Sequence, residues 1–245
     1  MSITMTLATT ARILRQLRHD RRTIAMILVI PTLLLTLLRY LFDSQPAVFD
    51  RIGLIMLGVF PMVIMFLLTS VAMLRERTSG TLERLLTTPI HKLDILLGYG
   101  LAFAVISAAQ AAVVSTLAYW LLGLDTQGSQ WLVGVIAIGN AILGMALGLF
   151  VSAFARSEFQ AVQFMPAVLL PQVLVCGLFV PREQMVGWLQ AISDVLPMSY
   201  AVQALTEVGA HADPTNTLWR DLAIIVGAAI VALVAGAATL RRRSG

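Results

Sequence analysis

The chain has 245 residues, of which 58% are hydrophobic and only 12% are charged, and its net charge is +4. Soluble domains carry roughly 25% charged residues, so this composition excludes an ordinary soluble protein. Several apolar runs reach the ~20 residues that a helix needs to cross a bilayer, whereas a membrane β-barrel would show short alternating segments. The sequence therefore predicts an all-α polytopic membrane protein that forms one domain over residues 1–245.

The chain begins with a polar and basic segment, residues 4–22, that is typical of an amphipathic helix rather than of a cleavable signal peptide. Such a helix is expected to lie in the membrane interface, with its basic side towards anionic headgroups. Its apolar side carries Leu7, Ala11, Leu14 and Leu17, and its basic side carries Arg12, Arg15 and Arg22.

Six membrane spans are predicted from the apolar runs that follow. A 30-residue run such as the third is long enough to tilt or to protrude from the membrane. The spans are expected at about 23–42, 52–74, 93–122, 131–154, 159–180 and 218–240.

Basic residues give the expected orientation, because Lys and Arg gather on the cytoplasmic side of membrane proteins. Four tryptophans fall near the opposite ends of the spans, where amphipathic rings favour the interface. Both termini are therefore expected in the cytoplasm. The basic residues on that side are Arg12, Arg15, Arg18, Arg21, Arg22, Arg75, Arg77, Arg84, Lys92, Arg156, Arg241, Arg242 and Arg243, those on the other are Arg39, Arg51, Arg182 and Arg220, and the tryptophans are Trp120, Trp131, Trp188 and Trp219.

A charged segment between the second and third spans interrupts the apolar pattern. Ser79 suits a helix N-cap, and Pro89 ends the segment because the residue before a proline avoids the α region. Leu82, Leu85 and Leu86 share one helical face. Two readings remain open: an amphipathic segment on the headgroups, or a short helix, at about 78–88, offered to a cytoplasmic partner.

Polar residues inside the spans are few, and they have two possible roles. They can form hydrogen bonds between helices, or they can line a weakly polar translocation surface. The fifth span also contains two prolines, which free backbone carbonyls and are tolerated beside other helices or a water-lined cavity. The candidate pathway residues within the spans are Gln110, Asn140, Gln163, Pro166, Pro171, Gln172 and Gly177.

The segment 181–217 is too apolar for a solvated loop of that length. Two short helices that dip back towards the outer leaflet fit it better, and Pro197 suits the first position of the second. Gly144 and Gly148 of the fourth span form a small-xxx-small pair that is typical of close helix packing. Pro181, Trp188, Pro197 and Tyr200 complete the candidate pathway and outer gate.

Several kinds of site are missing from the sequence. It contains no phosphate-binding G-x-x-x-x-G-K-[ST] loop, and its three histidines and single Cys176 form no metal pattern. No catalytic, cofactor-binding or metal residues are therefore expected, and no nucleic-acid binding. Acidic residues are absent from the middle of the spans, where a proton-coupled transporter usually needs one. Energy for uphill transport would have to come from a partner.

Two motifs resemble those of ABC type-2 transporter permeases. The segment 75–89, RERTSGTLERLLTTP, resembles the pattern R-E-R-x-x-G-T-L-E-x-L-L-x-T-P. The stretch from Phe179 through Trp188 to Tyr200 resembles a second signature, F-P-x-x-x-M-P-x-W-L through L-P-L-T-Y. The sequence departs from it at Val186, Met198 and Ser199.

The resemblance implies a permease subunit that dimerises and works with two ATPase subunits, so that ATP is bound only by the partner. It is strongest to bacterial drug exporters of the daunorubicin-resistance kind, which implies export of an amphipathic drug or antibiotic across the bacterial plasma membrane. The coupling helix would dock into a groove of the ATPase. The implied coupling residues are Glu76, Arg77, Thr78, Ser79, Gly80, Thr81, Leu82, Glu83, Arg84, Leu85 and Leu86.

Other readings remain. Within the same family, the cargo can instead be a lipid, a glycan precursor or a peptide. An autonomous channel or secondary transporter would need charged or backbone-lined filters, which the sequence lacks. The dimer can be formed by two identical chains or by two different ones.

Overall fold

The computed structural model describes residues 3–79 and 92–239, and within these ranges every regular element is helical. The coupling residues 80–86 therefore lie outside the described part of the chain. The elements are α1 (Ile3–His19), α2 (Arg21–Leu41), α3 (Pro46–Thr78), α5 (Lys92–Thr116), the π-helical turn η1 (Leu117–Leu121), α6 (Gln130–Ser152), α7 (Glu158–Val175), the 3-10 turn η2 (Arg182–Gln184), α8 (Gly187–Val195), α9 (Pro197–Ala210) and α10 (Asn216–Thr239).

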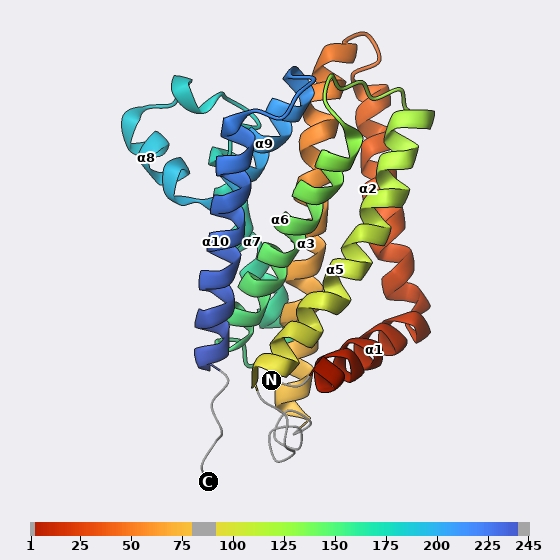
Figure 1. Ribbon diagram of the computed structural model, residues 1–245, viewed down its shortest axis with the longest axis vertical. Helices are drawn as coiled ribbons and strands as arrows, with labels where there is room; N and C mark the ends of the chain where they lie inside the picture. The colour runs from red at the N-terminus through yellow and green to blue at the C-terminus, as the bar shows by residue number, and fades with distance from the viewer. Residues whose placement is uncertain (1–2, 80–91, 240–245) are drawn as a thin grey trace.

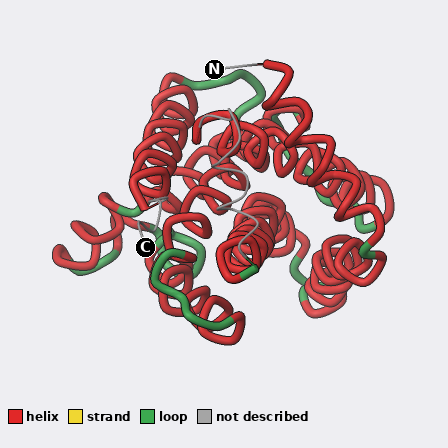
Figure 2. Tube along the Cα trace, turned by 90° about the horizontal axis from the view of Figure 1, so that it is seen from below, coloured by secondary structure: helices red, strands yellow, loops and turns green. Residues whose placement is uncertain are grey.

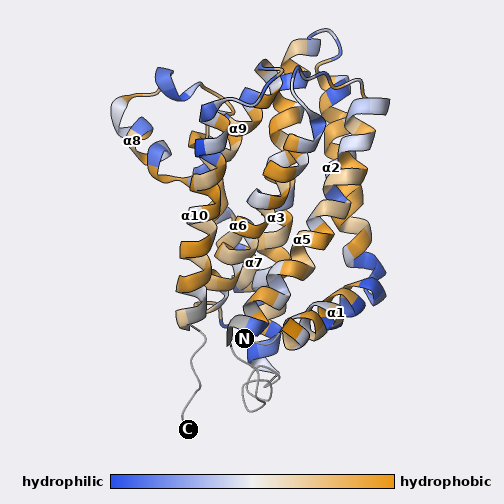
Figure 3. Cartoon of the chain, in the orientation of Figure 1, coloured by the Kyte–Doolittle hydropathy of each residue, from blue (hydrophilic) through white to orange (hydrophobic). Residues whose placement is uncertain are grey.

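Six of the described helices are long and apolar enough to cross a membrane, which confirms the predicted number of spans. They run roughly side by side as an upright bundle (Figure 1), and Figure 2 shows them nearly end-on. Along most of their length the helices carry apolar residues, and hydrophilic residues gather at the two ends (Figure 3). A bundle with this distribution suits a bilayer, since every helix satisfies its own backbone hydrogen bonds.

The break between α1 and α2 lies earlier than the sequence suggested. The predicted interfacial helix ran to residue 22, but α1 ends at His19 and Asp20 caps the next helix. The Asp20 carboxylate accepts hydrogen bonds from the backbone N–H of Thr23 at 3.1 Å and from its hydroxyl at 2.6 Å. These bonds lower the pKa of Asp20 below its ordinary value, because they favour the charged form. The cap lets α1 turn away from the bundle axis (Figure 1).

Two other boundaries differ from the prediction. Helix α3 is 33 residues long and continues through the charged residues to Thr78, whereas the second span was expected to end near Leu74. Helix α7 stops at Val175 rather than near Val180. The reason for the second difference is Gly177, whose φ of +97° an α-helix cannot contain.

Helices α3 and α6 form the centre of the bundle. A Cβ atom on Gly144 would lie 2.2 Å from the carbonyl oxygen of Met62, and one on Gly148 would lie 2.4 Å from that of Phe66. The two backbones therefore touch, which confirms the predicted small-xxx-small packing. Small residues allow such contact in membranes, where packing replaces the hydrophobic effect between helices.

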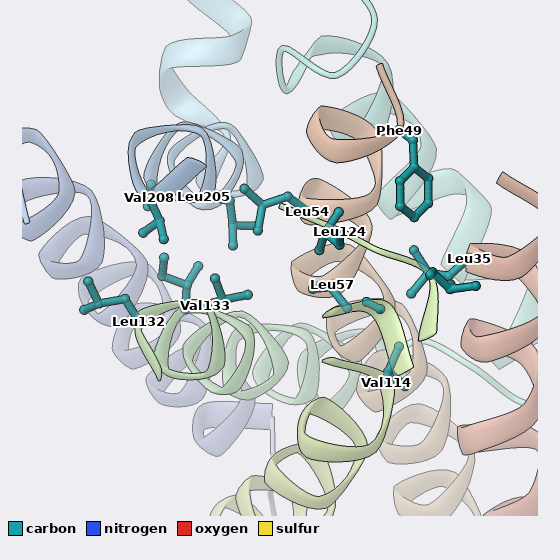
Figure 4. Close-up of a cluster of buried hydrophobic side chains, with 14 of the residues drawn as sticks. Leu35, Phe49, Leu54, Leu57, Val114, Leu124, Leu132, Val133, Leu205 and Val208 are labelled. Atoms are coloured by element: carbon teal, nitrogen blue, oxygen red, sulfur yellow. The ribbon is translucent and has the colours of Figure 1, made fainter. Parts of the chain in front are cut away.

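Buried apolar side chains fill the space around this helix pair. Towards the end that carries α9, Leu54 and Leu57 of α3 lie among side chains from α6 and α9, with Leu124 inserted from the loop after η1 (Figure 4). Towards the other end, Met65 of α3 packs with Phe103 of α5. Buried clusters thus line α3 near both of its ends.

The segment after α7 contains two short helices, as predicted. Pro197 begins α9, where its missing N–H costs nothing. Helix α8 protrudes to one side of the bundle (Figure 1) and leaves Trp188 65% exposed. Whether the pair reaches into the outer leaflet stays a prediction.

The two ends of the bundle differ in chemistry. Helix α1, the C-terminal ends of α3 and α10 and the beginning of α5 share one end, and α8 and α9 lie near the other (Figure 1). The predicted basic residues among the described ones, such as Arg75, belong to the first end. The four tryptophans belong to η1 and to the beginnings of α6, α8 and α10, near the second end, and are 51% to 86% exposed. This is the segregation of basic and aromatic residues that membrane proteins show.

Candidate functional site

The candidate site lies where the chain leaves α3 on its way to the predicted coupling helix. Arg75, Glu76, Arg77 and Thr78 form the last turn of α3, and the backbone N–H of Ser79 donates to the carbonyl of Arg75 at 2.9 Å. The sequence suggested that Ser79 caps the beginning of a helix. Ser79 is the C-cap of α3, and the helix that it was expected to begin lies outside the described residues.

Arg75 fastens this turn to α7. Its guanidinium donates two hydrogen bonds to the Glu158 carboxylate, at 2.7 Å and 2.9 Å. Both side chains are more than half exposed, so the pair adds little stability. Its bidentate geometry nevertheless fixes the orientation of the end of α3 relative to α7.

Glu76 fastens the same turn to α1. Its Oε1 atom accepts a hydrogen bond of 2.7 Å from Arg12, and its side chain is only 11% exposed. Tyr99 of α5, which is 2% exposed, interacts with both members of the pair. An ion pair whose carboxylate is nearly buried thus lies at the junction of α1, α3 and α5.

Close packing holds α1 against α5. Thr10 donates a hydrogen bond of 3.2 Å to the carbonyl of Gly98, and Thr6 donates to Asp94 at 3.5 Å. A Cβ atom on Gly98 would lie 2.6 Å from the side chain of Thr9, so only glycine fits there. Helix α1 is therefore packed into the end of the bundle that it shares with the C-terminal ends of α3 and α10 and the beginning of α5. We call this end the base of the bundle.

The face of α1 that packs includes only part of the leucine face that the sequence suggested, since Leu14 and Leu17 pack against the core cluster that contains Tyr99 and Phe103 of α5. Thr6, Thr9, Thr10 and Ile13 are buried, whereas Leu7 is 55% exposed. Thr10 and Thr6 donate to the Gly98 carbonyl and the Asp94 carboxylate of α5, whereas Thr9 donates to the Met5 carbonyl within α1. The exposed Leu7 is free to contact lipid.

Three of the predicted pathway residues within the spans, Asn140, Gln172 and Gln110, are buried in the structure. Asn140 donates to the carbonyl of Gly58 at 2.9 Å, which confirms hydrogen bonding between helices for this residue. Gln172 bonds within its own helix, to Val168 at 3.1 Å. Gln110 is 1% exposed, and within the described chain neither atom of its amide has a partner.

The remaining pathway candidates lie on α7 and in the segment after it. Of the candidates, only Tyr200 lines either of two cavities of about 330 Å³ near the end of the bundle that carries α9. The role of these residues stays a prediction. Gln163, Pro171 and Trp188 are exposed, and Pro166, Gly177, Pro181, Pro197 and Tyr200 are partly buried.

Sequence reasoning missed the partners of the charged residues. Arg12 and Glu76 are 64 positions apart, and Arg75 and Glu158 are 83 apart. A periodicity of three or four residues carries no information about such pairs. The only available signal was the placement of all four at the basic end of the predicted topology.

Comparison with known proteins assigns the family. The family model described as ABC-2 type transporter matches residues 4–208, so the chain belongs to this family of membrane permeases. It is 27% identical over 168 residues to the linearmycin resistance permease protein LnrN of Bacillus subtilis (strain 168), which covers 69% of this chain and 43% of that protein.

Two further relatives come from Escherichia coli (strain K12). The probable multidrug ABC transporter permease YbhR is 24% identical over 156 residues, covering 64% of this chain and 42% of its own length. The inner membrane transport permease YhhJ is 30% identical over 174 residues, with coverages of 68% and 44%. The chain thus spans less than half the length of the curated relatives it matches.

Proposed function

We propose that this chain is the permease subunit of an ATP-driven exporter and that a separate ATPase drives it through residues 78–88. The proposal rests on the base of the bundle. Helix α3 precedes this segment, α5 follows it, and both helices are bound to α1 there. The family supports the proposal, since ABC-2 permeases normally work with an ATPase subunit.

The geometry suggests how force would pass into the membrane. Residues 80–91 connect α3 to α5, and both helices are fastened to α1 by Glu76 and Gly98. A displacement of the segment would therefore move three helices together rather than one loop. The Arg75–Glu158 pair would carry the same displacement to α7.

Helix α7 is the element that we propose to line the pathway. Its prolines, Pro166 and Pro171, leave the carbonyls of Val162 and Ala167 without their usual donors, and the side chain of Gln163 is exposed beside them. Such polar groups are costly against lipid. A second permease chain or a solvated pathway would cover them, so we propose that the working unit contains two permease chains.

The proposed cargo is a hydrophobic or amphipathic compound of the drug or antibiotic class. The names of two relatives, which refer to linearmycin resistance and to multidrug transport, support this class. The basic base of the bundle would face the cytoplasm of a bacterial cell, with both termini inside. Transport would then run from the base towards α8 and α9.

Inside-out membrane vesicles that contain the chain and its ATPase test this function. We expect an amphipathic fluorescent dye to accumulate in them only when ATP is present, and an ATPase variant that cannot hydrolyse ATP to abolish accumulation. Dye accumulation driven by a proton or sodium gradient without ATP would contradict the proposal and favour a secondary transporter. ATP-dependent movement of a labelled lipid or peptide, but of no drug, would correct the cargo alone.

A further inference from the structure

A polar cavity lies where η2, α8, α9 and α10 meet. Its volume is about 330 Å³, at the lower limit of the range of roughly 300–1,000 Å³ that small-molecule sites occupy. Several residues in this region of the bundle are hydrophilic (Figure 3). Four charged residues line it, Arg182, Glu183, Asp194 and Arg220, together with the amides of Gln190 and Gln203.

Arg182 forms a fixed wall of this cavity. It is ion-paired with Asp194 and donates a hydrogen bond of 2.8 Å to Gln203. Its guanidinium also lies 5.1 Å from the centre of the Tyr200 ring. With three partners and a side chain only 14% exposed, Arg182 holds the cavity together and has little capacity for a ligand.

Arg220 and Glu183 are the groups that remain open. Arg220 uses its Nε and Nη2 atoms to hold Asp221, at 3.1 Å and 2.9 Å, so its Nη1 group has no partner in the described chain. Its side chain is 58% exposed. Glu183 is exposed and forms no ion pair within the same residues. The cavity thus offers one open cationic donor and one open anionic acceptor.

The charges around the cavity decide which ligand class fits. Two guanidinium groups face the carboxylates of Glu183 and Asp194, and the buried Asp221 adds a third carboxylate directly behind Arg220. The set therefore carries a net charge of about −1, which opposes a purely anionic ligand. A ligand that brings an ammonium group together with a phosphate satisfies both open groups.

The position of the cavity indicates where such a ligand comes from. Trp188 on α8 and Trp219 on α10 are 65% and 51% exposed, and each belongs to a helix that lines the cavity. Exposed tryptophans mark the headgroup level of a membrane. Ile192 and Val195 of α8 are also exposed, by 45% and 80%, and can rest against acyl chains.

We propose that this cavity binds the headgroup of a zwitterionic phospholipid with a primary ammonium, such as phosphatidylethanolamine. The phosphate accepts hydrogen bonds from Arg220, and the ammonium donates to Glu183 with Gln190 beside it. This site is independent of the cargo and of the ATPase. It would anchor α8, the protruding part of the fold, to the outer leaflet.

Native mass spectrometry of the purified chain tests the site with three added lipids: phosphatidylethanolamine, phosphatidylglycerol and phosphatidylcholine. Losing one charge-assisted hydrogen bond is expected to weaken binding by about tenfold. We therefore expect Arg220→Gln and Glu183→Gln each to reduce phosphatidylethanolamine adducts by that factor. The matched controls Arg51→Gln, which lines the other cavity, and Asp213→Asn, which is exposed, should leave them unchanged.

Each outcome decides the proposal, provided that all variants keep the melting temperature of the parent. Preference for phosphatidylethanolamine over both other lipids, lost in the two cavity variants only, supports it. Equal adducts in all variants, or a preference for phosphatidylglycerol or phosphatidylcholine, would overturn it. Equally strong, variant-sensitive binding of free glycerophosphoethanolamine would assign the cavity to a soluble zwitterion instead of a lipid.

Discussion

Arg12→Gln is expected to lower ATP-dependent transport about tenfold while the chain still inserts into the membrane. The substitution leaves the Glu76 carboxylate, 11% exposed, without the hydrogen bond that joins α1 to α3. A hydrogen bond to a charged group contributes about 1.5–3 kcal/mol, and we take the lower value because the Arg12 side chain is 35% exposed. About 1.4 kcal/mol corresponds to a tenfold change. Dye accumulation in inside-out vesicles measures the effect.

A double-mutant cycle separates this pair from general damage to α1. Glu76→Gln should lower transport as much as Arg12→Gln, and the double variant should be no worse than either single one. Arg15→Gln is the matched control, because Arg15 lies on the exposed side of the same helix. Losses that multiply in the double variant would show that the two residues act separately, contrary to the proposed junction.

Gly144→Leu and Gly148→Leu are expected to destabilise the centre of the bundle more than other single substitutions in α6. Even a Cβ atom at these positions would lie within 2.4 Å of a carbonyl oxygen of α3, and backbone cannot move aside as a side chain can. Overpacking typically costs about 1–3 kcal/mol, and the upper value lowers Tm by roughly 6–12 °C in a chain of this size. Thermal unfolding in detergent measures the shift.

The same helix offers a control. A Cβ atom on Gly134 would meet nothing within 4 Å, so Gly134→Leu should change Tm by less than about 2 °C, as surface substitutions do. If Gly134→Leu destabilised the chain as much as Gly144→Leu, a general effect of a larger side chain on α6, such as altered membrane insertion, would explain the loss. The contact between α3 and α6 would then not be the cause.

Hydropathy was sufficient to predict the spans because a bilayer demands long apolar helices whatever their tertiary packing. It failed where local chemistry decides a boundary. Asp20 is a preferred helix N-cap residue, a start signal that the prediction did not use. Gly177 likewise ends α7 through its positive φ, which hydropathy does not record.

The position of the base of the bundle could be predicted from the sequence, but the contacts that hold it together could not. The charged residues after the second span marked the region, yet α3 continues through Glu76 because its charges find partners on α1 and α7. Those partners are distant in sequence, so no local pattern reveals them. The same holds for α1, where threonines join Leu14 and Leu17 in the contact with α5.

If an ATPase acts on the chain immediately after α3, as we propose, a photo-cross-linker at Ser79 should reach it. Ser79 is exposed at the end of α3, and Trp219 at the opposite end of the bundle provides the control position. We expect the probe at Ser79, and not the probe at Trp219, to form a cross-link to a nucleotide-binding ATPase in native membranes, in an amount that changes when ATP is added. Cross-links from Ser79 only to lipid or to the permease itself would contradict this proposal.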